Sequence, residues 1–211
     1  MEIIRLFPSG DIAVNTYIAH ENGAAVLIDT PFAPDEALDV LKENSLTLKK
    51  ILLTHGHFDH IMSAQKLKDI TGAEIFIHEN DLPCLSDNTK NAGRYFGFEA
   101  PAVKSAMGVK DGDVITEGGM SFKVMNTPGH TDGSVLYITD SVIFSGDTLF
   151  CRSIGRTDVI GGNPAAMKQS LKKIAAVEGE YEIFPGHGGI STLDDEKLYN
   201  VYLKDGYDDF I

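Results

Sequence analysis

Residues 54–60, Thr-His-Gly-His-Phe-Asp-His, hold three histidines and one aspartate and are the stretch of this sequence best equipped for chemistry. Imidazole nitrogens and carboxylate oxygens are ordinary ligands of zinc and of similar divalent metals. Alternate residues of an extended chain face the same side, so the side chains of His55, His57 and Asp59 are expected on one side of this segment. His60 would then face another side, and a set split in this way suits two metal ions better than one. A polar surface loop is the alternative interpretation.

Further candidate ligands follow glycines, each shortly after a predicted strand: His130, Asp147 and His187. A glycine lets the backbone approach a neighbour closely. The unequal separations between the Gly-His pairs argue against a repeat and favour several loops that converge on one rim. Asp29, which closes an earlier strand, is expected either to accept hydrogen bonds that steady the metal loop or to be an ordinary turn carboxylate.

Short strands and amphipathic helices must hold these loops in position. The predicted strands cover residues 3–6, 13–19, 24–28, 49–53, 74–77, 114–116, 121–125, 135–138, 142–145 and 181–184. The predicted helices cover residues 34–43, 61–70, 163–177 and 192–204. The order strand, metal loop, helix around residues 54–60 indicates a site at the ends of strands.

Residues 81–108 lack a sustained period and are long for a structureless connection inside a compact domain. One interpretation is a lid or insertion that brings Tyr95 or Phe96 near a substrate. The other is a set of short helices that pack these aromatic side chains on the core. Apart from this segment, a chain of 211 residues with 43% hydrophobic content predicts a single domain over residues 1–211.

Composition excludes several classes of function. The net charge of −13 would repel a nucleic acid, and the sequence has no run rich in lysine and arginine. No stretch is long and apolar enough for a membrane span, and the start of the sequence does not read as a signal peptide, so a cytoplasmic protein without a membrane partner is expected. The two cysteines, Cys84 and Cys151, are both expected to be buried thiols rather than a disulfide.

Four motifs follow one another along the chain, from about residue 28 to residue 189: Thr-His-x-His-x-Asp-His, then Pro-Gly-His-Thr, Gly-Asp and Pro-Gly-His. In this order they resemble the motifs of the metallo-β-lactamase-fold hydrolases, and in particular of the short, single-domain, glyoxalase II-like branch. The resemblance implies an α/β protein, an αββα sandwich of two mixed sheets flanked by helices. The site would lie at one edge, between the sheets.

The resemblance also implies a metal centre with seven ligands. The ligands of the first ion would be His55, His57 and His130, those of the second Asp59, His60 and His187, and the bridging ligand Asp147. A hydroxide held between two divalent ions would attack the carbonyl of a small thioester, hydroxyacylglutathione-like, or of an ester, with Asp59 handling the released proton. Zinc is the first expectation for both ions, and iron and manganese accept the same ligands.

Two features bear on the substrate. True β-lactamases do not have a bridging aspartate at the position of Asp147, so a β-lactam substrate is not expected. Arg156 stands where glyoxalase II enzymes contact glutathione, but Asp158 replaces an expected aromatic residue, and only a short tail follows Gly189 in place of a glutathione-binding region. Arg156 is therefore expected to pair either with a substrate carboxylate or with Asp158.

A different reaction class is the main alternative. Persulfide dioxygenases share the fold and a Gly-Arg-Thr-Asp stretch, present here at residues 155–158, but use one iron held by two histidines and a carboxylate. Their ligands would correspond to His57, His130 and Asp147. A binding protein without activity on the same scaffold is a further alternative. The dinuclear hydrolase is preferred because all seven ligand positions are filled.

Overall fold

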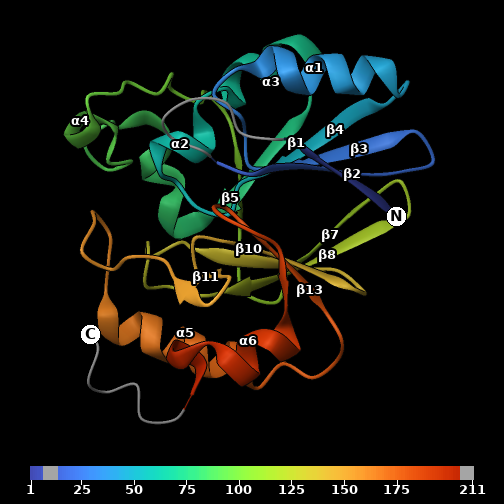
Figure 1. The fold of residues 1–211 in the computed structure, drawn as a ribbon. Helices are drawn as coiled ribbons and strands as arrows, with labels where there is room; N and C mark the ends of the chain where they lie inside the picture. The colour runs from blue at the N-terminus through green and yellow to red at the C-terminus, as the bar shows by residue number, and fades with distance from the viewer. Residues whose placement is uncertain (7–13, 205–211) are drawn as a thin grey trace.

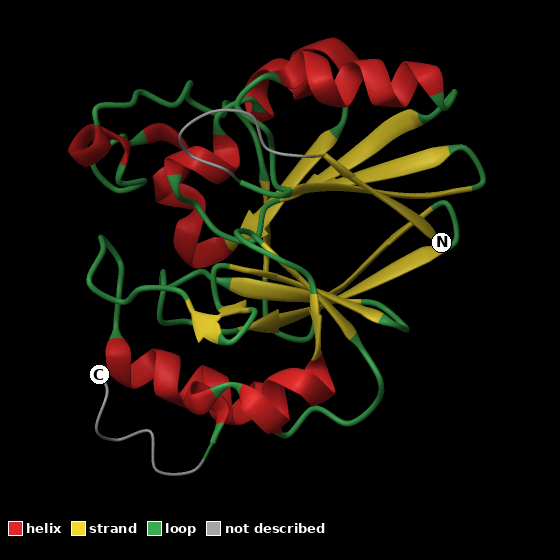
Figure 2. Cartoon of the chain, viewed as in Figure 1, coloured by secondary structure: helices red, strands yellow, loops and turns green. Residues whose placement is uncertain are grey.

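Two mixed sheets pack face to face, and helices cover both outer faces (Figures 1 and 2). The structure is a computed structural model that describes residues 1–6 and 14–204. This arrangement is the predicted αββα sandwich, which is confirmed. Among the described residues, no helix is long and apolar enough to cross a membrane.

The first sheet has the strand order β1-β2-β3-β4-β5-β6. Its strands are β1 (Glu2–Leu6), β2 (Thr16–Glu21), β3 (Ala24–Ile28), β4 (Thr47–Leu52), β5 (Glu74–His78) and β6 (Met107–Val109). Strands β1 to β3 are antiparallel, and β3 to β6 run parallel. The outer face carries α1 (Pro34–Glu43) and α3 (Ala64–Thr71), as Figure 1 shows.

The second sheet has the order β14-β13-β10-β9-β8-β7. Its strands are β7 (Val114–Glu117), β8 (Met120–Asn126), β9 (Val135–Ile138), β10 (Val142–Gly146), β13 (Glu182–Pro185) and β14 (Ser191–Thr192). Among the described strands of this sheet, only β10 and β13 pair in parallel. Helices α5 (Pro164–Ala175) and α6 (Leu193–Tyr199) cover its outer face, and β11 (Leu149–Phe150) with β12 (Ser153–Ile154) forms a small separate ribbon.

Strand β3 shows why such short, apolar strands are needed. Val26 and Ile28 belong to the core between the sheets, whereas Ala25 and Leu27 belong to the core under the helices. Successive side chains of a strand point to opposite faces, so a strand that is buried on both faces must be apolar at nearly every position. Phe144 and Ile143 of β10 divide in the same way between the central core and the core under α5.

Two predicted helices differ from the structure. The helix expected at 61–70 is divided into α2 (Phe58–Ile61) and α3, which ends at the left-handed Gly72 (φ 76°). The last helix was expected to reach residue 204, but it ends at Tyr199. The reason is Asn200, whose Nδ2 donates to the carbonyl of Ser153 at 3.0 Å and whose Oδ1 starts the 3₁₀ turn η2 (Val201–Leu203).

The second strand, predicted at 13–19, is found at Thr16–Glu21, and residue 13 lies outside the described residues. Residues 81–108 contain the end of the 3₁₀ helix η1 (Glu79–Ser86) and the short helix α4 (Gly93–Phe96), and Leu85, Ala100 and Val103 join the core under the first sheet's helices.

The expectation for Cys151 is wrong. It is exposed, because it lies in the turn between β11 and β12, whereas Cys84 is buried as expected.

Candidate metal centre

The predicted ligands gather at one edge of the sandwich, because four strands of the two sheets end there. His55 follows β4, His130 follows β8, Asp147 follows β10 and His187 follows β13. Three groups of their side chains bring ligand atoms within 4.8 Å of one another: His55, His57 and His130; His55, His60 and Asp147; Asp59, His60 and His187. The convergence predicted from the four motifs is thus present in the fold.

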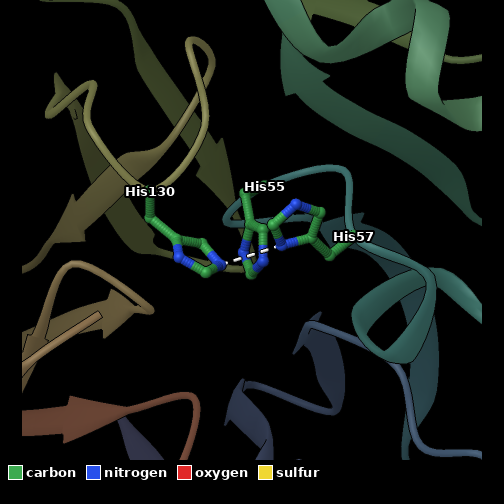
Figure 3. Close-up of side chains that lie close together, drawn as sticks. All are labelled: His55, His57 and His130. Atoms are coloured by element: carbon green, nitrogen blue, oxygen red, sulfur yellow. Dashed lines mark hydrogen bonds between the residues drawn. The ribbon is translucent and has the colours of Figure 1, made fainter. Parts of the chain in front are cut away.

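His55, His57 and His130 turn their imidazole rings toward one another (Figure 3). His57 Nδ1 lies 2.8 Å from His130 Nε2. The ring of His55 lies 4.8 Å from each of the other two, between ring centroids. Three convergent nitrogens of this kind can hold one metal ion.

Asp59 does not lie on the side that alternation predicted. His57 is the N-cap of α2, so the extended chain ends there and the next residues follow a helix. Helical geometry places Asp59 beside His60 and His187, with His187 Nε2 at 3.4 Å and His60 Nε2 at 3.8 Å from Asp59 Oδ2. A local turn of helix therefore separates the two halves of the His-rich segment.

Asp147 lies between the two groups. Its Oδ1 is 3.4 Å from His60 Nε2, and its Oδ2 is 3.4 Å from His187 Nε2 and 3.6 Å from His130 Nε2. A carboxylate has two oxygens and can bind two ions at once. The position of Asp147 suits that role.

Each of the four buried histidines among the candidate ligands has one ring nitrogen held by the protein. His60 Nδ1 donates to Asp29 Oδ2 at 2.8 Å, His130 Nδ1 to the carbonyl of Arg156 at 2.8 Å, and His57 Nε2 to the carbonyl of Ile160 at 3.2 Å. His55 Nδ1 lies 3.2 Å from Thr54 Oγ1. Such bonds fix the tautomer of an imidazole and leave its other nitrogen as the ligand atom.

Three buried atoms at the centre have no hydrogen bond among the described residues: His55 Nε2, His60 Nε2 and Asp147 Oδ1, of which the last two lie 3.4 Å from each other. A buried polar atom without a partner is costly, and each such atom in a native protein calls for an explanation. These three face the space that the candidate ligands share. The residues present therefore fit a centre of divalent metal ions.

The charges of the centre are divided between the two groups. Burial lowers the pKa of His130 to about 4, and it also holds the pKa values of His55 and His57 below their usual range. Burial alone would lower the pKa of His187 as well, but the Asp147 and Asp59 carboxylates raise it to about 10. The first group is thus neutral and ready to bind a cation, whereas a metal at the second group must displace a proton.

Asp29 ties the metal loop to the first sheet. It is 1% exposed, and it accepts hydrogen bonds from the amide and the hydroxyl of Thr54, both at 2.8 Å, besides the bond from His60. Its left-handed backbone (φ 55°) turns the carboxylate back toward the loop. Aspartate is among the few residues apart from glycine that adopt this conformation readily.

Asp81 connects the two loops of the first group, and no pattern in the sequence indicates this role. Its Oδ2 accepts from the amide of Gly56 at 2.8 Å and from Thr131 Oγ1 at 2.7 Å, and its Oδ1 accepts from the amide of Gly133 at 2.9 Å. Gly56 lies between two candidate ligands, and Thr131 follows a third. An isolated aspartate in an irregular segment carries no signal that would distinguish it from a surface residue.

Glycines allow the close approaches at this edge. A Cβ at Gly186 would collide with Asp147 Oδ1 and lie 2.7 Å from His60 Cε1, and a Cβ at Gly146 would collide with the side chain of Thr54. The glycines that precede the candidate ligands are thus required by the packing of the loops, as expected from the sequence.

A pocket of about 450 Å³ opens over the centre. Phe96 and Arg156, two of the residues expected near a substrate, line it. Tyr95, the third, is 65% exposed and is not among the lining residues. Arg156 pairs with Asp158 through Nε at 2.7 Å and Nη2 at 2.9 Å. Of the two partners expected for Arg156, the structure shows Asp158.

Comparisons with known proteins agree with this architecture. The model of the metallo-β-lactamase superfamily matches residues 9–187. The hydroxyacylglutathione hydrolase GloC of Haemophilus influenzae is 31% identical over 187 residues, which cover 85% of this chain and 87% of that protein.

Among solved structures, the B3 metallo-β-lactamase BLEG-1 is similar with a TM-score of 0.88 and 34% identity, over 96% of this chain and 100% of that one. The structure of TTHA1623 in a di-iron-bound form is similar with a TM-score of 0.83 and 32% identity, over 93% and 100%. The fold, the histidine- and aspartate-lined centre and the family match lead to one conclusion: the chain belongs to the metallo-β-lactamase superfamily.

Proposed function

We propose that this protein is a metal-dependent hydrolase with a dinuclear centre that cleaves a thioester or an ester of a small molecule. The observation that carries the proposal is the set of three buried atoms without a hydrogen bond, His55 Nε2, His60 Nε2 and Asp147 Oδ1, at a centre whose Asp147 lines the pocket. In this assignment His55, His57 and His130 hold one ion, Asp59, His60 and His187 hold the other, and Asp147 is shared.

When bound, two divalent ions supply a water molecule that ionises near neutral pH and a Lewis acid for a carbonyl oxygen. The protein's own groups prepare the centre for this role. Asp29, the carbonyl of Arg156 and the carbonyl of Ile160 hold the imidazoles so that their free nitrogens face the shared space. Positioned ligands of this kind need not reorganise during the reaction.

Asp59 is the proposed proton carrier. It is less buried than Asp147, and it lines the pocket where the substrate would lie. Burial would raise its pKa, but the nearby His60 and His187 lower it, so the carboxylate is ionised at neutral pH. An ionised carboxylate beside the reacting groups can accept the proton that is released and pass it to the leaving group.

Related proteins support the proposal at the level of the reaction class. Hydroxyacylglutathione hydrolases of Haemophilus influenzae and Francisella tularensis are 31% and 30% identical to this chain. The neighbour in a di-iron-bound form makes iron a metal to test beside zinc. The neighbour described as a B3 metallo-β-lactamase makes a β-lactam a necessary part of the substrate panel.

The proposal is tested by measuring zinc, iron and manganese in the purified protein and then assaying S-lactoylglutathione, simpler thioesters, carboxylic esters and a β-lactam. Two ions per chain and turnover of a thioester or ester are expected. Asp147→Ala should lose one ion and nearly all activity. Asp140→Ala is the matched control, because Asp140 is an exposed aspartate in the hairpin that leads to β10. Retention of both ions and most of the activity by Asp147→Ala would refute the shared ligand.

A mononuclear iron dioxygenase that acts on a persulfide is the second candidate. His130 Nε2 lies 2.8 Å from His57 Nδ1 and 3.6 Å from Asp147 Oδ2, so these three residues could also form a site of two histidines and one carboxylate. One iron per chain with oxygen uptake that depends on a persulfide would support this candidate and exclude the dinuclear hydrolase.

A further inference from the structure

The walls of the pocket over the centre are almost entirely apolar. Above the candidate ligands, the lining side chains without a polar group are Phe58, Ala92, Phe96, Phe150, Ile154 and Val159. They come from three separate segments of the chain: α2, α4 with the residue before it, and the stretch from β11 to residue 159. An apolar wall assembled from several segments is suited to bind an apolar group of a ligand.

Phe96 is the most exposed part of this wall. Its ring stacks on that of Phe58, with centroids 5.6 Å apart, yet 51% of Phe96 remains exposed. Phe58 in turn stacks on Phe98, at 5.0 Å, and is itself buried. The outermost ring of an anchored aromatic stack is therefore open toward the pocket, where an apolar substituent could cover it.

The pocket offers little to an anionic substrate beyond the centre itself. Arg156 is the only lysine or arginine among the described residues that line it, and its Nε and Nη2 both donate to Asp158. A carboxylate of the substrate would have to compete with a bidentate partner in the same loop. The net charge of −13 opposes the approach of anions as well.

We infer that the substrate of this pocket is a thioester or ester whose acyl or thiol group is apolar, and that the protein discriminates against the charged glutathione moiety. The inference rests on the proposed hydrolase activity and specifies its substrate class. Glutathione carries carboxylates at both ends of the tripeptide, whereas the walls present aromatic and aliphatic carbon. The apolar group lies against Phe96 and Phe58, and the carbonyl carbon faces the candidate ligands on the floor.

The test compares kcat/KM for two series with the metal-loaded protein: acetyl, butanoyl and hexanoyl thioesters of N-acetylcysteamine, and methyl, butyl and hexyl thioesters of acetic acid. Burial of a methylene contributes about 0.8 kcal/mol, so kcat/KM should rise about fourfold per methylene in at least one series. S-lactoylglutathione should be a poorer substrate than the longest member of that series. If neither series rises, or if S-lactoylglutathione is preferred, the inference is overturned while the hydrolase assignment stands. If no thioester or ester is cleaved, the proposed function itself fails.

Phe96→Ala provides a second measurement with a matched control. Phe96 is half exposed, so its truncation should leave the fold intact and lower kcat/KM about tenfold for the longest substrate of the rising series, with a smaller loss for the shortest. Tyr95→Ala is the control, since Tyr95 is the adjacent exposed aromatic residue and does not line the pocket. An equal loss for both variants, or no change in chain-length dependence for Phe96→Ala, would overturn the assignment of the apolar wall.

Discussion

Replacement of Asp81 by alanine should both destabilise the protein and loosen the first group of candidate ligands. The carboxylate accepts three hydrogen bonds, from the Gly56 amide at 2.8 Å, the Thr131 hydroxyl at 2.7 Å and the Gly133 amide at 2.9 Å. The hydroxyl keeps a second partner in Ser134 Oγ, at 2.8 Å. Alanine therefore leaves two amides without an acceptor next to the candidate metal loops.

The size of the effect follows from these bonds. An unsatisfied buried donor costs roughly 1–3 kcal/mol, so Asp81→Ala should lower the free energy of unfolding by about 2–6 kcal/mol. Whole domains are stable by only about 5–15 kcal/mol. Asp81→Asn retains one acceptor oxygen and removes a charge whose burial raises the pKa of this carboxyl, so its loss should be smaller, about 1 kcal/mol.

Urea unfolding of the metal-free protein, followed by circular dichroism, measures this stability. Competition with a chromophoric chelator then measures metal affinity, which should fall about 10–100-fold for Asp81→Ala if the first group binds an ion. Asp132→Ala is the control, because Asp132 is exposed in the same loop as Gly133. A urea midpoint for Asp81→Ala equal to that of the control would refute the structural reasoning. If Asp81→Ala loses the expected stability but keeps an unchanged metal affinity, only the link between Asp81 and the metal centre is refuted.

Two other predictions concern the packing and the charges of the centre. Gly186→Ala should abolish metal binding and activity, because the new Cβ would collide with Asp147, whereas Gly189→Ala should be neutral, since no atom lies within 4 Å of a Cβ there. Elemental analysis of both variants checks this, and a fully metallated Gly186→Ala protein would contradict it. The metal-free protein should be most stable near pH 6.5. Burial lowers the pKa of His130 to about 4, so the stability associated with its neutral form is lost as the pH falls from 6.5 toward 4. The carboxylates raise the pKa of His187 to about 10, and the stability that its protonation contributes is lost as the pH rises from 6.5 through 10. Urea midpoints between pH 4 and 10 measure the loss of stability on both sides of pH 6.5. A stability that rises steadily with pH over this range would rule out the loss assigned to His187.

Local patterns were sufficient for most of the elements. The helix expected at 34–43 and the strands expected at 24–28 and 135–138 have those bounds in the structure. Each is a short segment whose hydrophobic period and flanking turn residues agree. The last helix was predicted too long, because Asn200 ends it through hydrogen bonds to Ser153 and Glu196. Ser153 is 47 positions away in the sequence, so the local pattern does not show its contact with Asn200.

The order of histidine, aspartate and glycine motifs along the chain was enough to indicate the family, the fold and the residues that would meet at the edge. Ligand types and their glycine neighbours are properties of the sequence, and strands that end at one edge of a sandwich bring them together. The division of Asp59 from His55 was not predictable from strand alternation, because the start of α2 depends on how the loop packs.

The contacts that support and cover the centre belong to the folded chain alone. Asp81 reaches Gly133 across 52 positions, and the apolar wall joins Phe58 to Phe96 and to the stretch from β11 to Val159. No periodicity links residues so far apart, since their approach depends on the packing of the two sheets and on the paths of three loops. The candidate ligands can therefore be identified from residue types and spacing alone, whereas the shape and polarity of the pocket above them arise from tertiary packing.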